Sequence, residues 1–291
     1  MIVLTAPTGH IGSKVLTGLL EHDEPVRLIV RDPAKLHDSV RERVEVIVGS
    51  HRERTVLDQA LPGADALFWL MPSEHTAPSI YDTYVTASLP GAEAVHEYGV
   101  ERVVIVSALG RGTGLYAGHV SASLAMEDLF RSTGVHVRAL ANPSFMDNLL
   151  RQIASLKNGV LSDMLPVDLR LPFIATKDIA AVAVRLLRRR DWIGQDTVDL
   201  LGSEDLSLND MAAVLTEVLG TPIHAETSDR GTNRAMLIDY GFSEAVAQAM
   251  LDMYAAKERG LDHRVRRAPE NTTPTTFRQF AEEVVKPAFL A

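Results

Sequence analysis

Short apolar runs alternate with amphipathic segments through the first half of the chain, and this alternation limits the fold more than any other feature. The runs are nearly continuously apolar, as expected of strands in a parallel sheet covered on both faces. The expected strands are 2–5, 26–30, 44–48, 66–70, 103–107 and 135–141. Helices are expected between them, as at 11–21, where Val15, Leu16, Leu19 and Leu20 recur at helical spacing. Strands and helices in this order predict a doubly wound α/β fold with a parallel sheet.

The alternation loosens after about Asn142. Helices are expected near 173–190, 207–219, 243–258 and 275–285, with a short strand at 197–201 and a loop at 263–276. In the first half, the helical stretch before the fifth expected strand is long and ends at about residue 98. We therefore expect residues 1–150 to hold the sheet and residues 151–291 to form a smaller C-terminal lobe, interleaved with the first part in one compact unit.

The composition of the 291 residues excludes several function classes. The chain has no cysteine, which excludes disulfides, thiolate catalysis and cysteine-based zinc sites. A net charge of −9 argues against a general affinity for nucleic acid. No run of about 18 apolar residues and no secretion signal is present, so we expect a cytoplasmic protein without a membrane span, as a monomer or homodimer. No His, Asp or Glu pair has convincing metal-ligand spacing, so no metal is expected.

The stretch TAPTGHIG (5–12) joins the first strand to the first helix, where α/β proteins hold a dinucleotide pyrophosphate. Gly9 would let the backbone approach phosphate, and Gly12 would let the helix pack closely on the first strand. Backbone N–H groups from about Thr8 to Ile11 would bind the phosphate at the positive end of the helix dipole. Residues 1–150 are thus expected to be a Rossmann-type dinucleotide-binding part and residues 151–291 a substrate-facing lobe. The predicted cofactor-binding residues of the loop are Thr5, Thr8, Gly9, His10, Ile11 and Gly12.

The loop opens with alanine where such loops usually have glycine. Pro7 follows Ala6 and favours an extended conformation of that residue, besides removing one N–H donor. The turn is therefore expected to form only if Ala6 needs no positive φ.

The end of the second strand bears on the choice between NADP and NAD. Enzymes that prefer NAD commonly have an acidic residue there, which binds the ribose hydroxyls. Here Arg31 follows Val30 directly and Lys35 lies four residues further on, and both could pair with a 2′-phosphate. We expect NADP(H) as the cofactor. NAD stays possible, because Asp32 could serve a ribose and Arg31 could be a solvated loop residue.

Several further segments resemble one family: VRDPAKL (30–36), ERVVIVSALG (101–110), NPSFMDNLL (142–150) and ATKDIAAVAVRLL (175–187). The chain resembles, nearly end to end, the NmrA-like atypical short-chain dehydrogenases/reductases, which include NADPH:quinone reductases, phenylpropanoid reductases and cofactor-sensing regulators. The resemblance implies that Phe145 and Met146 are walls of a substrate pocket, although core packing would also explain both. The cofactor contacts that it implies are Met71 and Pro72 at the ribose, Ser107 and Ala108 near the nicotinamide, and Asn142, Pro143, Ser144 and Phe145 also near the nicotinamide.

The chain departs from this family where an acidic residue is often found near adenine and where a lysine is often found before Glu127. Ser50 stands at the first place and Ser123 at the second. No lysine occurs between residues 35 and 157, so the general acid of the phenylpropanoid-type reductases is absent.

A Tyr-x-x-x-Lys pair is absent too, because Val120 lies four residues after Tyr116. Tyr116 and His119 are the remaining candidates for a catalytic proton donor, and His119 is the better one because an imidazole exchanges protons near neutral pH. A solvent-facing histidine at a helix start is the alternative.

These features predict an NAD(P)-dependent oxidoreductase that acts on a small aromatic, quinone-like or conjugated carbonyl compound, for example as a natural-product tailoring enzyme. A reduced quinone oxygen can take its proton from water, so the missing lysine fits a quinone reductase better than a phenylpropanoid reductase. Two alternatives stay open: a non-catalytic NAD(P)-sensing regulator, and an atypical tailoring enzyme that catalyses a rearrangement or oxygenation.

Overall fold

The structure, a computed structural model, describes residues 1–291 and divides into two compact units, each built from several segments. Unit 1 comprises residues 1–108, 122–141 and 179–198, and unit 2 comprises residues 109–121, 142–178 and 199–291. The assignment of a dinucleotide-binding role to residues 1–150 and of a substrate role to residues 151–291 stays a prediction.

Unit 1 is built on a seven-stranded sheet with the order β10-β6-β5-β4-β1-β2-β3. The pairs β1–β2, β1–β4, β2–β3 and β4–β5 are parallel. β1 lies inside the sheet, with β2 and β3 on one side of it and β4, β5, β6 and β10 on the other, which is the order of a doubly wound Rossmann sheet. The predicted fold class is confirmed. The strands are β1 (Ile2–Leu4), β2 (Val26–Val30), β3 (Glu45–Val48), β4 (Ala66–Trp69), β5 (Arg102–Ala108), β6 (His136–Asn142) and β10 (Gln195–Asp199).

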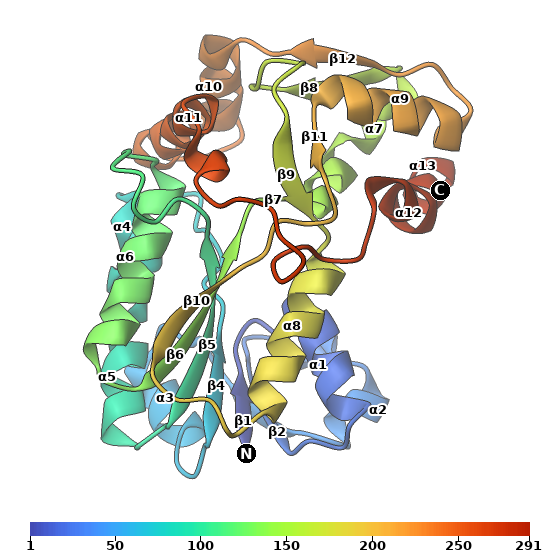
Figure 1. Cartoon of the computed structure of the whole chain (residues 1–291). Helices are drawn as coiled ribbons and strands as arrows, with labels where there is room; N and C mark the ends of the chain where they lie inside the picture. Colours follow the sequence, from blue (N-terminus) through green and yellow to red (C-terminus); the bar gives the residue numbers. More distant parts are fainter. The chain divides into compact units, whose positions relative to one another are not determined.

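Helices cover both faces of this sheet, with α3, α5 and α6 on one side and α1 and α8 on the other (Figure 1). The predicted long helical stretch before residue 98 is interrupted. Pro90 stands in the first turn of α5, and since proline lacks an N–H group it starts a helix more readily than it continues one. The helical elements are α1 (Gly12–Leu20), η1 (Pro33–Lys35), α2 (Asp38–Arg41), α3 (Arg54–Ala60), α4 (Ile80–Tyr84), η2 (Thr86–Ser88), α5 (Leu89–Glu97), α6 (His119–Ser132) and α8 (Thr176–Arg188).

The apolar stripe of α1 holds the first βα unit in place. Val15, Leu16 and Leu19 are at most 5% exposed, as their helical spacing predicts. Burial of each such side chain stabilises the fold by about 1.5–3 kcal/mol. Gly18 brings α1 close to α8, because a Cβ on this glycine would lie 2.9 Å from Val184 Cγ2.

Unit 2 contains two small sheets, β11-β9-β7 and β12-β8, and its own apolar core. The helices predicted at 207–219 and 243–258 are confirmed, and residues 264–276 form a loop as predicted. Ser207 and Asp210 cap the start of α9 with reciprocal hydrogen bonds, which fixes where that helix begins. The elements are β7 (Ser144–Phe145), η3 (Met146–Gln152), α7 (Ile153–Lys157), β8 (Val160–Asp163), β9 (Leu171–Ile174), β11 (Asp205–Leu206), α9 (Leu208–Leu219), β12 (His224–Thr227), α10 (Arg230–Asp239), α11 (Glu244–Glu258), η4 (Leu261–His263), α12 (Phe277–Phe280), η5 (Ala281–Val285) and α13 (Lys286–Leu290).

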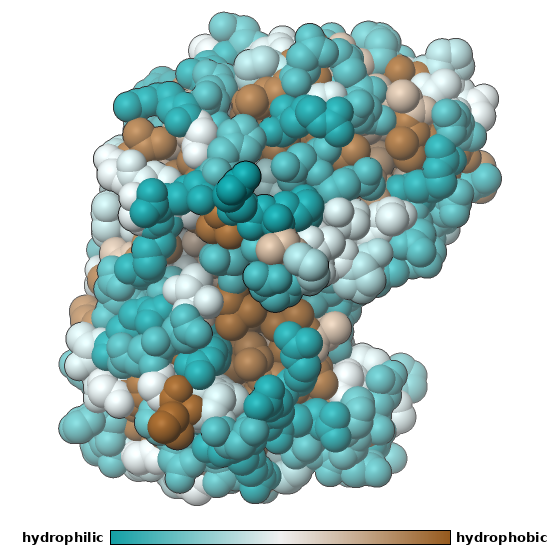
Figure 2. Space-filling view, in the orientation of Figure 1, coloured by the Kyte–Doolittle hydropathy of each residue, from teal (hydrophilic) through white to brown (hydrophobic).

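Most residues on the face drawn in Figure 2 are hydrophilic, and the apolar ones form small patches. None of the helices combines the length and the apolar composition that a membrane crossing requires.

Candidate functional site

The turn after β1 has the conformation that the sequence argument excluded. Ala6 has a φ of +50°, in the left-handed region, and its carbonyl oxygen accepts a hydrogen bond of 3.1 Å from the Gly9 N–H. The prediction that Ala6 avoids a positive φ is therefore wrong. The left-handed conformation costs an alanine about 1–2 kcal/mol, which the closed turn offsets, and this cost explains why glycine is usual at this position.

Gly12 is required by the same turn. A Cβ on residue 12 would lie 2.1 Å from the Ala6 carbonyl oxygen, so no other residue fits there without moving the loop. The closest approach at Gly12 is thus made to the turn itself, and the close packing of the helix on β1 stays a prediction. At Gly9, by contrast, the nearest atom to an added Cβ is 3.5 Å away, which is an ordinary contact.

The loop leaves backbone donors at the start of α1. The Gly9 N–H is used inside the turn, and Pro7 has none, whereas the N–H groups of Thr8, His10 and Ile11 make no hydrogen bond within the protein. No side chain caps α1, and its first turn has no acidic residue. Free N–H groups at the positive end of a helix dipole form a binding site for an anion such as a pyrophosphate.

Thr5 stabilises the start of this loop through hydrogen bonds of its side chain. Its side chain is fully buried, donates to the Phe68 carbonyl oxygen (3.0 Å) and accepts from the Leu70 N–H (2.9 Å). The hydroxyl therefore joins β1 to the end of β4, and any contribution of Thr5 to cofactor binding is to position the loop.

A cavity of about 610 Å³ lies in unit 1 beside the loop. The loops that follow β1, β2, β3 and β4 line it, so it opens at the carboxyl ends of the parallel strands, where ligands of such sheets bind. Its volume is in the range of small-molecule and cofactor sites. The lining residues are Ala6, Pro7, Thr8, Gly9, Ile29, Val30, Arg31, Gly49, Ser50, His51, Arg52, Pro72, Ser73 and Glu74.

Of the two basic residues predicted near the end of β2, only one lines the cavity. Arg31 lines the cavity, is exposed, and makes no ion pair or hydrogen bond through its side chain. Lys35 is exposed at the end of η1 and does not line the cavity. Asp32 accepts a hydrogen bond of 3.1 Å from the Ala34 N–H and so caps η1, which engages the carboxylate that could have served a ribose.

Three further polar residues of the cavity were not singled out from the sequence. Arg52 pairs with Glu74 and donates to the Pro72 carbonyl oxygen (3.2 Å). His51 lies edge-on to Trp69, with 5.2 Å between ring centroids, and its Nε2 atom is buried without a hydrogen-bond partner. Burial, and then the charges of Arg52 and Arg31, lower the pKa of His51 to about 4, so this imidazole is neutral at pH 7. His51 and Arg52 belong to the charged run HRER (51–54), which begins three residues after the end of β3 and is the one sequence signal for them, and Glu74 lies outside this run.

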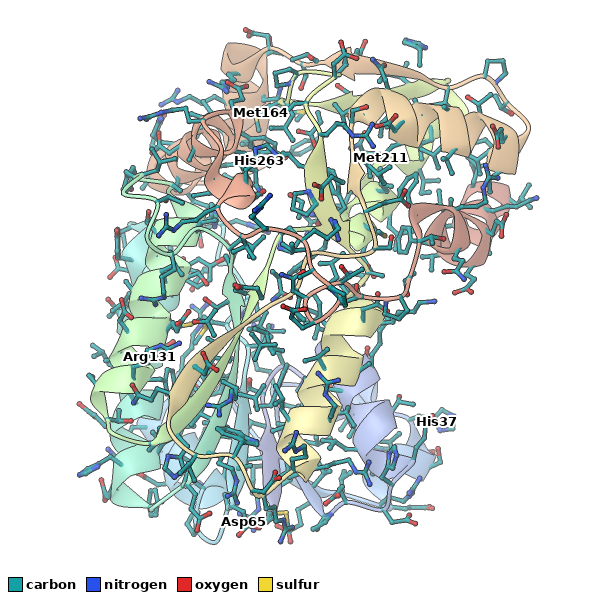
Figure 3. The ribbon with its side chains drawn as sticks, viewed as in Figure 1. His37, Asp65, Arg131, Met164, Met211 and His263 are labelled. Atoms are coloured by element: carbon teal, nitrogen blue, oxygen red, sulfur yellow. The ribbon has the colours of Figure 1, made fainter.

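Ser107, at the end of β5, is held by a buried polar network. Its hydroxyl donates to a Glu127 carboxylate oxygen at 2.8 Å, and Glu127 is fully buried in an ion pair of 2.7 Å with Arg131. Arg131, labelled on α6 in Figure 3, also donates to the Thr197 hydroxyl at 2.9 Å. This network fixes the rotamer of Ser107, whose place near a nicotinamide stays a prediction, as does that of Ala108.

The residues predicted at the ribose differ in how accessible they are. Pro72 lines the cavity, but Met71 is only 5% exposed and packs in the core of unit 1. Met71 therefore contributes its backbone at most.

In unit 2 the segment after β6 starts a second sheet. Asn142 ends β6, and its carbonyl oxygen accepts from the Leu109 N–H at 3.0 Å. Ser144 and Phe145 pair with β9 and are partly exposed. Met146 is fully buried in the core of unit 2, a packing that does not support its predicted place in a pocket wall. The roles predicted for Asn142, Pro143, Ser144 and Phe145 stay predictions.

The two candidate proton donors lie in unit 2. His119 is the first residue of α6 and is half-buried, whereas Tyr116, in the preceding loop, is 57% exposed. Ser123, at the position of the family lysine, is buried in α6. The catalytic roles of His119 and Tyr116 stay predictions.

The model of a family described as NAD(P)H-binding matches residues 7–190. The chain belongs to this family. The match begins inside the turn after β1 and includes every residue that lines the cavity except Ala6, so it agrees with the anion site and the unpaired Arg31 described above. These residues fit NADP(H). The free N–H groups of the loop can bind the pyrophosphate, and Gly9 has no Cβ to obstruct its approach. Arg31 can pair with the 2′-phosphate.

Relatives and solved structures cover nearly the whole chain. A (4-alkanoyl-5-oxo-2,5-dihydrofuran-3-yl)methyl phosphate reductase from Streptomyces griseus is 29% identical, over 89% of this chain and 88% of the relative. An NAD(P)H azoreductase from Xenophilus azovorans is 26% identical, over 88% of this chain and 86% of the relative. The crystal structure of an NADPH-dependent quinone oxidoreductase from Escherichia coli, complexed with NADPH, has a TM-score of 0.80 and 21% identity, over 98% of this chain and 100% of that one. The expected resemblance to NADPH:quinone reductases is confirmed.

Proposed function

We propose that the protein is an NADPH-dependent oxidoreductase that reduces conjugated, electron-poor carbonyl compounds such as quinones. The observation that carries this proposal is the cavity at the carboxyl ends of β1–β4, which combines the free N–H groups of the phosphate loop with the unpaired Arg31. A pyrophosphate and a 2′-phosphate are the groups that such donors recognise. The reductases and the oxidoreductase to which the chain is similar support the same reaction class.

The residues of the chain favour a conjugated acceptor over a simple ketone. NADPH, when bound, supplies the hydride, and the protein has to bind and orient it and to manage one proton. A simple carbonyl develops an alkoxide that needs a positioned acid, and the chain has serine in place of the family lysine at position 123. A quinone or an enone spreads the negative charge over a conjugated system, so water can supply the proton. The phosphate reductase from Streptomyces griseus supports this reading, because its name describes a conjugated oxo-dihydrofuran.

A panel of acceptors tests the proposal. The purified protein is mixed with NADPH and, in separate assays, menadione, an α,β-unsaturated lactone, a saturated dialkyl ketone, or no acceptor, while absorbance at the nicotinamide band and dissolved oxygen are followed together. We expect NADPH oxidation with menadione or the lactone and none with the ketone. Tight NADPH binding without turnover of any acceptor would refute the enzymatic proposal and favour a cofactor-sensing regulator. Oxygen uptake that matches NADPH oxidation in the assays without menadione would favour an oxygenation instead, because reduced menadione itself consumes oxygen when it is reoxidised.

A further inference from the structure

Two arginines from neighbouring strands line the same cavity. Arg31 follows β2, and Arg52 lies four residues after the end of β3, which pairs with β2 in parallel. Lys35, the cation expected to act together with Arg31, is absent from the lining. The cavity therefore offers a 2′-phosphate two guanidinium groups in place of one guanidinium and one ammonium group.

The ion pair between Arg52 and Glu74 is exposed enough for a phosphate to replace it. Its side chain is 28% exposed and that of its partner Glu74 is 48% exposed. Ion pairs with this much contact with water contribute little to stability, because water screens the two charges. A phosphate dianion carries more charge than one carboxylate and can accept both N–H bonds of a guanidinium fork, so it competes effectively with Glu74 for Arg52.

The pKa of His51 indicates that the charges of both arginines reach the same part of the cavity. The charges of Arg52 and Arg31 both lower the pKa of this buried imidazole, after the effect of burial. Charges that act together on His51 also act together on a dianion in the same cavity, since both residues and His51 line it.

We propose that Arg52, and not Lys35, is the second ligand of the 2′-phosphate of NADPH, and that it exchanges Glu74 for this phosphate when the cofactor binds. The inference rests on the proposed cofactor and names the residues that select it. Glu74 opposes the 2′-phosphate in two ways, because it competes for Arg52 and because it carries a like charge. NADH has no 2′-phosphate, so the pair between Arg52 and Glu74 stays intact when NADH binds.

Calorimetric titration with NADPH, NADH, 2′,5′-ADP and 5′-AMP tests this exchange without any turnover. Arg52→Ala should weaken NADPH and 2′,5′-ADP by about tenfold or more, the size expected of hydrogen bonds to a charged group, and leave NADH and 5′-AMP nearly unchanged. Glu74→Gln should tighten NADPH and 2′,5′-ADP by about three- to tenfold, the effect of removing one like charge at a screened, short distance. The opposite signs are the decisive readout, because loss of a merely structural ion pair would move both variants in the same direction.

Two matched controls keep the experiment specific. Arg54→Ala removes an arginine of the same segment that pairs with Asp58 and Glu97 outside the cavity lining, and Lys35→Ala removes the expected cation. Both controls should bind NADPH as the unmodified protein does. Equal shifts for NADPH and NADH in the Arg52 and Glu74 variants, or a selective loss with Lys35→Ala, would overturn the inference while leaving the proposed function intact. Failure of the unmodified protein to bind NADPH at all would refute the proposed function itself.

Discussion

Replacing His51 by glutamine should remove a large part of the pH dependence of the protein's stability on the acid side. Burial first, and then Arg52 and Arg31, hold the pKa of His51 at about 4 in the folded protein, against 6.5 for the free side chain. The unfolded chain therefore binds more protons than the folded one between these two values. The contribution of His51 to the free energy of unfolding is fully present above about pH 6.5 and falls as the pH drops toward 4.

The size of the effect follows from the shift. Each unit of pKa difference corresponds to about 1.36 kcal/mol, so a shift from 6.5 to about 4 corresponds to about 3 kcal/mol once both states are protonated. At pH 5 the unfolded chain is already protonated and the folded one is not, which corresponds to a loss of about 2 kcal/mol relative to pH 7.5. These are upper values, because residue 51 as a whole is only half-buried and solvent screens the charges of the two arginines.

Urea unfolding at pH 7.5 and pH 5.0 measures this contribution. The drop in the free energy of unfolding between the two pH values should be about 1–2 kcal/mol smaller for His51→Gln than for the unmodified protein. His96→Gln, which changes an exposed histidine of α5, is the matched control and should keep the full drop. An equal drop in the His51 variant and in the unmodified protein would show that the buried imidazole is not held neutral, and would refute the argument.

Four further substitutions have expected results. Gly12→Ala should destabilise the protein by about 1–3 kcal/mol in thermal unfolding, because the added Cβ would meet the Ala6 carbonyl oxygen, and an unchanged stability would contradict the tight turn. Gly9→Val should fold normally but lose NADPH affinity, which calorimetry would show. Glu127→Gln should cost about 3 kcal/mol in urea unfolding because it leaves Arg131 of the buried pair without its countercharge, and an unchanged midpoint would argue against that pair. His119→Ala should change menadione turnover only several-fold while leaving the NADPH Kd unchanged, whereas a loss of about 10²–10⁴-fold in kcat would identify His119 as a general acid.

The sequence predicts the sheet of unit 1 well because its strands carry their own signal. β2 matches its prediction at both ends, and β1, β3 and β4 differ by one residue. β1, β2 and β4 are mostly buried and read as nearly uninterrupted apolar runs, and β3, which is partly exposed, still carries three consecutive β-branched residues. Unit 2 lacks that signal. β12 has the sequence HAET and is mostly exposed, and β7 and β11 have two residues each, so neither periodicity nor apolar content marks them as strands.

The candidate site is predictable where the position of a residue after a strand decides its role, and less so where a contact with another residue of the folded chain decides. Gly9, Gly12 and Arg31 follow from their positions after the first two strands. The φ of Ala6 does not, because the preference that Pro7 imposes locally is overridden by the closure of the turn on Gly9. Arg52 joins the cavity only because β3 lies beside β2, and pairs with a residue 22 positions further along the chain. Such a contact has no local sequence signal.

The division of the chain into units also sets when the protein can fold during its synthesis. Unit 1 takes its last segment from residues 179–198, which contribute most of α8 and most of β10 to the edge of its sheet. A nascent chain that ends at residue 150 has the phosphate loop and its cavity but lacks Val184, against which Gly18 of α1 packs. The seven-stranded sheet is therefore complete only once residue 198 has been made, when residues 109–121 and 142–178 of unit 2 are already part of the chain, and no uninterrupted stretch of gene encodes unit 1 alone.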